Sequence, residues 1–424
     1  MLNDRYDNPL TTTSQSARDA YIEGVDSILS ASAGGDRVLQ QAIEADDGFA
    51  LAHAALARTL QISARGADAV EAMTKARALA AGTSDREKGH IAMLDHLIDG
   101  DAPSAYAAAI DHLAAYPRDV LIAQPLTGVF GLIGFSGLAG REAEQLAFLT
   151  RLAPHYGEDW WFGTQFAFAQ IEVGQADRAS RTIESALDGN PRSAHGAHVR
   201  AHIHYERGES EAGLSYLGNW RRDYDRQGAL HCHLSWHVAL WTLERGDTAA
   251  AWRVIDEGVR PGKAWGPPLN VLTDTASFLH RAELAGETPQ PDRWREVSEF
   301  ARQLFPNPGI AFADVHSALA HAMAGETDAL AKLIAEPAGP AGEVVTALAQ
   351  AFNAFACQEW AETIALLAPV MAMHERIGGS RAQRDLLEYT LVAALLKAGR
   401  ADDARLMLAT RRPKKVRASQ VVGL

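Results

Sequence analysis

Apolar residues recur along most of the chain three or four positions apart, and short turns containing glycine or proline separate one run from the next. Strand signals are almost absent, because no alternation of β-branched and polar residues persists for more than a few positions. The pattern therefore predicts an all-α protein. The most apolar stretch, residues 121–140, is interrupted by Gln124, Pro125 and several glycines. We expect a buried, irregular helix pair there and no membrane span.

The helical pattern repeats along the chain. In the unit from Trp161 to Pro191, Gly174 opens a turn, and Pro191 ends the second helix because it cannot donate the next backbone hydrogen bond. Further turn glycines follow at Gly208, Gly246, Gly286, Gly325 and Gly399. The first interval, from Gly174 to Gly208, is 34 residues, the period of tetratricopeptide repeats. These spacings predict a tetratricopeptide-like, right-handed α-solenoid, a superhelix of stacked helical hairpins.

This reading divides the chain into three parts. We expect a flexible N-terminus at residues 1–20 and a single continuous solenoid over residues 21–410, with its clearest repeats at 160–325. Residues 411–424 form a basic tail, and the run from Arg411 to Lys415 is typical of a solvated extension.

Charge and cysteine content argue against a nucleic-acid-binding protein and against a disulfide-stabilised one. The formal net charge of −13 argues against a nucleic-acid partner, because phosphates would be repelled over most of the surface. Two cysteines, Cys232 and Cys357, exclude a disulfide framework and fit a reducing compartment. The first twenty residues lack the apolar core of a secretory signal. We therefore expect a cytoplasmic protein without a membrane partner.

Histidines are concentrated in one tenth of the chain. Seven of the sixteen fall between His195 and His237. His198 and His202 are four positions apart, so they share one face of a helix, and His233 and His237 form a second such pair. Both pairs precede a turn glycine, which places them in the first helices of adjacent hairpins. Neighbouring helices lie about 8–10 Å apart, so the two pairs can converge.

Three segments carry a family resemblance: His198-Val-Arg-Ala-His202-Ile-His204, Cys232-His233-Leu-Ser-Trp236-His237, and the region that includes Asp274 and Asp314-Val-His316. This text resembles the tetratricopeptide repeat protein 38-like family over most of the chain, best between about residues 160 and 325. The family is named for its fold, so the resemblance supports the architecture and says little about chemistry. It implies that the first helices line the concave face of the superhelix, where ligands bind.

The histidines and two aspartates then define a candidate pocket. Imidazole is suited to proton transfer because its ordinary pKa lies near neutral pH. Asp274 or Asp314 could orient a ring nitrogen. The residues expected to be catalytic are His202, His237, Asp314 and His316. Those expected to bind the ligand are His198, His233, Trp236, Asp274, Trp161 and Tyr205.

Two other interpretations remain open. No His-Glu-x-x-His motif or Cys/His knuckle is present, so no cofactor is expected from motifs; if a metal is bound, its ligands are His198, His202, His233 and His237. Alternatively, the chain is a non-enzymatic adaptor that binds a peptide or partner protein in its concave groove. We favour an enzyme that applies histidine acid–base, hydrolytic-type chemistry to a small organic ligand. Solenoid ends need capping, which would suit a homodimer.

Overall fold

This computed structural model describes residues 2–411 and 420–424, and most of them lie in helices. Two strands, β1 (Leu2–Asn3) and β2 (Pro9–Leu10), form a short antiparallel hairpin. The helices of the first half are α1 (Gln15–Ser30), α2 (Gly35–Ala45), α3 (Ala50–Ile62), α4 (Gly66–Leu79), α5 (Asp85–Ile98), α6 (Ala102–Ala115), α7 (Val120–Ala123), α8 (Arg141–Tyr156), α9 (Trp160–Glu172), α10 (Ala176–Gly189), α11 (Ala194–Arg207) and α12 (Ser210–Trp220). Those of the second half are α13 (His231–Glu244), α14 (Thr248–Gly258), α15 (Pro268–Leu284), α16 (Pro291–Leu304), α17 (Ala311–Ala324), α18 (Thr327–Ala335), α19 (Gly342–Ala356), α20 (Trp360–Val370), α21 (Arg381–Lys397) and α22 (Ala401–Arg411). Short 3-10 turns lie at η1 (Ala80–Gly82), η2 (Gln124–Leu126), η3 (Arg221–Asp223) and η4 (His374–Ile377).

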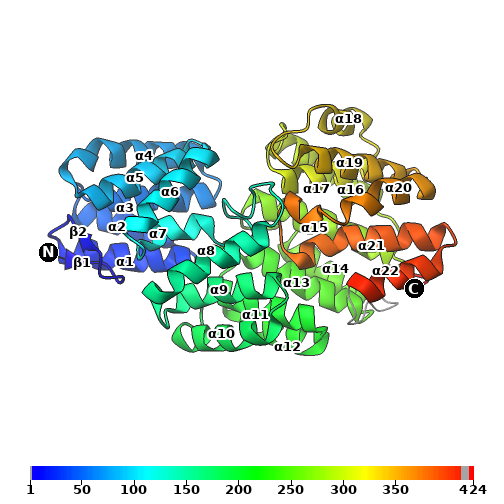
Figure 1. The fold of residues 1–424 in the computed structure, drawn as a ribbon, viewed down its shortest axis with the longest axis horizontal. Coiled ribbons are helices and arrows are strands. Elements are labelled where there is room, and N and C mark those ends of the chain that lie inside the picture. The colour runs from blue at the N-terminus through cyan, green and yellow to red at the C-terminus, as the bar shows by residue number, and fades with distance from the viewer. Residues whose placement is uncertain (1, 412–419) are drawn as a thin grey trace.

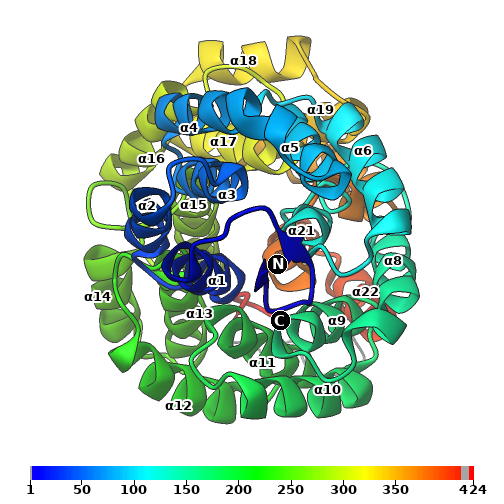
Figure 2. The same cartoon turned by 90° about the vertical axis from the view of Figure 1, so that its left-hand side faces the viewer.

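Neighbouring helices pack in chain order as hairpins, for example α9 with α10, α11 with α12 and α13 with α14 (Figure 1). The first helices also pack against one another: α9 against α11, α13 against α15, and α15 against α17. Figure 2 shows the hairpins arranged around a ring, with α10, α12 and α14 outside and α9, α11 and α13 nearer the centre. The all-α prediction is confirmed, and the arrangement is compatible with a helical solenoid.

The turn glycines occupy the turns that the sequence predicts. The backbone φ angle is positive at Gly174, Gly208, Gly246, Gly286, Gly325 and Gly399. At Gly208, for example, φ is 67°, and the residue ends α11 by donating its N–H to the Tyr205 carbonyl at 3.0 Å. A residue with a Cβ is strained in this conformation. Both histidine pairs therefore lie in first helices, as the repeat register predicts.

Helix α21 lies against the inner helices and joins parts of the chain that are distant in sequence. Tyr205 of α11 donates a 2.7 Å hydrogen bond to Asp385 of α21, and Arg281 of α15 donates to the carbonyl of Ala382. Arg384 of α21 pairs with Glu142 of α8. Because α21 makes these contacts from α8 to α15, it covers the inner side of this part of the ring.

The N-terminal segment is not the flexible extension that was expected. The β1–β2 hairpin and the start of α1 occupy it, and Tyr6 and Leu10 are buried in the core. Arg5 also pairs with Asp159 at 2.8 Å. These contacts hold the N-terminal segment against the middle of the chain.

Two further predictions concern irregular segments. Residues 121–140 do not form a helix pair: after α7 and η2 the chain runs through turns to Arg141, because Gly128 and Gly137 adopt left-handed conformations. Of the expected basic tail, residues 412–419 lie outside the described part of the chain. Beyond them, Val421 is buried and the Val422 N–H donates to the Leu284 carbonyl at 2.9 Å.

Among the described residues, no helix combines the length and the apolar character needed to cross a membrane.

Candidate metal centre

The four histidines of the two i, i+4 pairs converge between α11 and α13. The Nε2 atoms of His198 and His202 are 2.9 Å apart. The ring centres of His198 and His233 are 4.7 Å apart, and those of His202 and His237 are 4.8 Å apart. One nitrogen from each ring can be chosen so that all four lie within 4.8 Å of one another. Helical spacing brings each pair together, and hairpin stacking brings the pairs together.

The cluster is enclosed by apolar and aromatic side chains. Phe168 of α9 lies 5.4 Å from the His198 ring and 5.1 Å from the His202 ring. Trp236 stacks on His233 with the ring centres 5.2 Å apart. All four histidines are buried, and the exposed fraction of His202 and His237 is 0%.

Burial sets the protonation state of these imidazoles. Burial, together with a smaller effect of like-charge repulsion from His233, lowers the pKa of His202 to about 3. Burial also lowers the pKa of His198 and His237 well below the ordinary value, again with help from neighbouring histidines. These three rings are therefore neutral at physiological pH, which is the form of histidine that ligates metals.

Asp274 of α15 orients one member of the cluster. Its carboxylate accepts from Nδ1 of His233, at 3.0 Å to Oδ1 and 2.9 Å to Oδ2. Burial raises the pKa of Asp274, while His233 and the side-chain amides of Gln383 and Asn270 lower it. Because Nδ1 of His233 faces the carboxylate, Nε2 is left for the centre of the cluster. A carboxylate behind a ligating histidine is the usual arrangement around protein-bound metals.

Three nitrogens in the cluster have no hydrogen-bond partner, and one of them is Nδ1 of His202. Neither Nδ1 nor Nε2 of the fully buried His237 forms a hydrogen bond. A buried polar group without a partner costs about 1–3 kcal/mol. A neutral imidazole has one lone pair to donate, so a cation between the rings would satisfy it.

A bound ion would require a definite spacing of the four ligand nitrogens. Nitrogens bonded to a tetrahedral ion at about 2.0–2.1 Å are about 3.3 Å apart. The Nε2 atoms of His198 and His202 are closer than this, at 2.9 Å. The largest separation among the four ligand nitrogens is wider, at up to 4.8 Å. Imidazole ligands suit zinc, copper, iron and nickel. The four histidines fit an ion of this class.

Other residues that the sequence assigned to the site lie elsewhere. The carboxylate of Asp314 accepts from the Gly309 N–H at 3.0 Å, and burial raises its pKa to about 6. His316 bonds the carbonyl of Phe312 in its own helix at 2.7 Å. Asp274, not Asp314, therefore orients an imidazole of the cluster, and the expectation that Asp314 and His316 join the cluster is not met.

Two aromatic residues also differ from the expectation. Trp161 packs against Tyr156, with the ring centres 5.7 Å apart, in the core of the N-terminal half. Tyr205 lies one helical turn beyond His202 and lines a separate pocket.

Cys232 is fully buried, and burial raises the pKa of its thiol well above the ordinary value. Its sulfur lies 3.6 Å from the Val259 carbonyl. Its sulfur also lies 4.0 Å from Oδ2 of Asp274, so the thiol packs against the carboxylate that faces His233.

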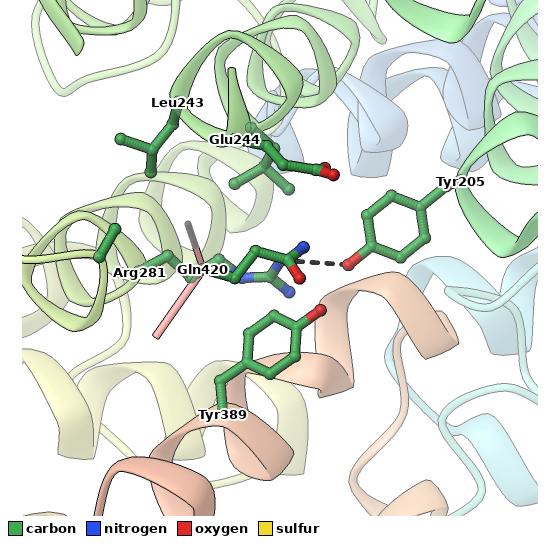
Figure 3. A pocket seen from close by; sticks show the side chains of 8 residues that line it. Tyr205, Leu243, Glu244, Arg281, Tyr389 and Gln420 are labelled. Atoms are coloured by element: carbon green, nitrogen blue, oxygen red, sulfur yellow. Dashed lines mark hydrogen bonds between the residues drawn. The ribbon is translucent and has the colours of Figure 1, made fainter. Parts of the chain in front are cut away.

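The pocket beside the cluster is drawn in Figure 3. The space in it that water-sized molecules can occupy is small, about 20 Å³. Its lining residues come from α11, α13, α15, α21 and the C-terminal segment: Tyr205, Leu240, Leu243, Glu244, Arg281, Ala285, Tyr389 and Gln420. The guanidinium of Arg281 lies 5.6 Å from the ring centre of Trp236, which itself stacks on His233. Arg281 therefore connects the pocket with the cluster.

Sequence reasoning missed Phe168 and Arg281. Phe168 precedes His202 by 34 residues, so the repeat period could have placed it one hairpin away on the same face. Arg281 was harder to identify from the sequence. The only indication was a positively charged residue within a helix, α15, that is mostly apolar. Its partners on α21 are about a hundred residues away in sequence, and no local pattern identifies them.

No protein-family model matches the chain. The resemblance to the tetratricopeptide repeat protein 38-like family therefore remains an expectation that depends on the quoted segments.

Proposed function

We propose that the protein is a metal-dependent enzyme that applies hydrolytic-type chemistry to a small organic ligand at the inner side of a right-handed, tetratricopeptide-type solenoid. The observation that carries this proposal is the convergence of four buried imidazoles, of which His198, His202 and His237 are neutral and His237 has no hydrogen-bond partner for either nitrogen. His198, His202, His233 and His237 would hold one divalent transition-metal ion. If the ion also kept a fifth, open position, it would supply Lewis-acid polarisation and would lower the pKa of a water bound there.

The roles of the histidines change accordingly. A ring whose pKa is about 3, such as His202, is not an imidazolium at neutral pH, so it has no acidic second proton and is a poor general acid. The same neutral ring is a good ligand, so His202 and His237 are assigned to ion binding and not to proton transfer. Asp274 fixes the tautomer and direction of His233 through its 2.9 Å contact with Nδ1. Phe168 and Trp236 exclude water from two sides.

The alternative of a peptide-binding adaptor receives less support. An adaptor of this class needs an open groove along several inner helices. Here α21 lies over the inner side of the ring, where it contacts Tyr205 of α11, Arg281 of α15 and Glu142 of α8. A ligand at the histidines must therefore be small.

Metal removal and replacement test the proposal. Purified protein would be stripped with a chelator, reloaded separately with Zn²⁺, Mn²⁺, Fe²⁺, Co²⁺ and Ni²⁺, and assayed against a panel of small esters, amides and phosphoesters. We expect hydrolysis of at least one class that is absent from the stripped protein and returns on reloading.

A matched pair of variants separates the site from general damage. His202→Ala removes a ligand, whereas His321→Ala removes an equally buried histidine of α17 that contacts Ser298 at 2.7 Å. Metal-dependent activity should be lost in the first variant only. Equal activity of stripped and reloaded protein, or equal loss in both variants while both stay folded, would refute the proposal.

A further inference from the structure

We propose that residues 420–424, here called the terminal strap, control access to the four-histidine cluster by covering the pocket beside it. The docked strap admits only water-sized molecules to the pocket, and the detached strap admits larger solutes. This names a form of regulation for the proposed metal site and rests on that function. The contacts of the strap involve only this chain, so they can be tested on protein without metal.

The pocket lies about one helical turn from the imidazoles. Tyr205 follows His202 by three residues on α11, and Leu240 follows His237 by three residues on α13. Three residues of α-helix rise about 4.5 Å. Because His202 and His237 are both fully buried, a solute must pass between the inner helices to reach them, and the pocket brings it close to both.

The terminal strap supplies one wall of this pocket. Gln420 lines it together with side chains of the ring helices, and Figure 3 shows Gln420 beside Arg281, between Tyr205 and Tyr389. With Gln420 in place, the free space is about 20 Å³. A single water needs about 10–15 Å³ measured in this way. The docked strap therefore excludes metal chelators, organic ligands and other solutes much larger than water.

The strap is anchored mainly by one side chain and one backbone hydrogen bond. Val421 is 1% exposed and packs in the core of the C-terminal helices, and it is the only buried residue of the strap. The Val422 N–H donates to the Leu284 carbonyl at 2.9 Å, at the end of α15. Gly286 allows this approach, because a Cβ there would lie 2.8 Å from Cγ2 of Val422.

This anchor is weaker than the rest of the cover over the cluster. Every residue of α21 from Ala382 to Leu395 is buried, so moving α21 would expose a large part of the core. In the strap, one buried side chain and one hydrogen bond are set against the conformational freedom that five residues lose on docking. The strap can therefore detach while the helices stay folded.

Chemical labelling of metal-free protein tests the proposal. Diethyl pyrocarbonate acylates neutral imidazoles that it can reach, and mass spectrometry gives the rate at His202 and His237. Val421→Asp places a charge at the buried anchor, so it should raise both rates about tenfold or more, because labelling follows the fraction of molecules with a detached strap. Val422→Asp adds the same charge at a position that is 58% exposed and should match wild type. Equal rates in Val421→Asp and wild type would overturn the proposal.

Two other histidines report on the rest of the molecule. His155 is exposed and should be acylated equally fast in all three proteins. His90 is fully buried on α5, with Nδ1 2.9 Å from Asp119, and should stay protected in all three. If Val421→Asp also exposes His90, Val421→Ala decides, because it removes two methyl groups without adding a charge. It should label the cluster faster than wild type with His90 still protected, and no increase would overturn the proposal.

Amide hydrogen exchange in the wild-type protein gives an independent measurement. The Val422 N–H should exchange through local detachment, at a rate that low concentrations of urea leave unchanged. Amides in the middle of α21 should exchange only through a larger opening that urea promotes. A Val422 amide with the same urea dependence as those of α21 would contradict a strap that detaches by itself.

Metal uptake, measured on the same proteins, separates this inference from the proposed function. Faster labelling in Val421→Asp of a protein that takes up no metal would support the strap and refute the proposed function. Metal uptake together with equal labelling rates would overturn the strap and leave the proposed function standing.

Discussion

At the scale of single residues, the four imidazoles are held in different ways. His233 is fixed by Asp274, whereas His198 and His202 face each other and His237 has no protein partner. Asp274 is thus the side chain outside the ligand set that most directly controls the direction of a ring nitrogen.

Removing the charge of Asp274 should weaken metal binding. In Asp274→Asn, the amide no longer provides an anionic acceptor for Nδ1 of His233, and we expect a metal affinity lower by about 10–100-fold. The measurement is competitive titration with a chromogenic chelator. Asp314→Asn is the control, because that carboxylate bonds the Gly309 N–H and not the cluster. Equal affinities in wild type and Asp274→Asn would show that the carboxylate does not act on the site.

The sequence indicated part of this arrangement. Helical spacing correctly grouped His198 with His202 and His233 with His237, because residues four apart share a helix face. Helical spacing could not show which of Asp274 and Asp314 contacts a histidine of the cluster. Both lie in first helices, and only the distance between stacked hairpins decides which carboxylate meets an imidazole.

At the scale of elements, the approach of α12 to α13 depends on a glycine. A Cβ at Gly213 would lie 2.6 Å from two ring atoms of Trp241 and 3.1 Å from the His204 Cβ. Trp241 follows His237 by four residues and is fully buried. The missing side chain at position 213 therefore lets α12 lie against the helices that hold the cluster.

Two glycines of α12 make a matched test of this contact. Gly213→Ala should lower the free energy of unfolding by about 1–3 kcal/mol through overpacking. Gly218→Ala should raise it by up to about 1 kcal/mol, because no atom lies within 4 Å of its added Cβ and alanine favours the helix. Urea denaturation measures both. A stabilised Gly213→Ala protein would contradict the close approach described here.

Prediction from sequence was most successful for regular elements. Turn glycines gave the register of the hairpins because a left-handed residue is needed at those turns. Residues 121–140 were misjudged, since apolar composition alone does not distinguish a buried helix from a buried glycine-rich turn segment.

At the scale of the whole molecule, α21 joins the two halves of the ring through a buried charged network. Glu172 of α9 accepts from the backbone N–H of Arg381, the first residue of α21, at 2.9 Å. Burial raises the pKa of Glu172 from 4.5 to about 7. The charged groups that act on it are Arg384, Glu142, Glu206 and Arg141. These contacts could not be inferred from sequence, because the partners are about two hundred residues apart.

The raised pKa of Glu172 makes stability depend on pH. Between pH 4.5 and about 7 the folded protein binds this proton more tightly than the unfolded chain does, so the free energy of unfolding falls as pH rises through that window. Glu172→Gln should remove this slope and make the protein more stable than wild type at pH 8, by on the order of 1–3 kcal/mol. At pH 5 the two proteins should be similar.

Chemical denaturation at pH 5, 6, 7 and 8 measures this effect. Glu184→Gln, at an exposed position of α10, serves as the control and should follow the wild-type curve. A Glu172→Gln protein whose stability runs parallel to wild type at all four pH values would show that Glu172 does not carry the raised pKa.

The metal content of the purified protein tests the central claim most directly. We expect elemental mass spectrometry to find one transition-metal ion per chain in wild type and in His321→Ala, and less than about a tenth of that in the folded His198→Ala and His237→Ala variants. A wild-type protein that holds no ion after expression with supplementary metals, and takes up none on titration, would contradict the assignment of the four histidines as a metal centre.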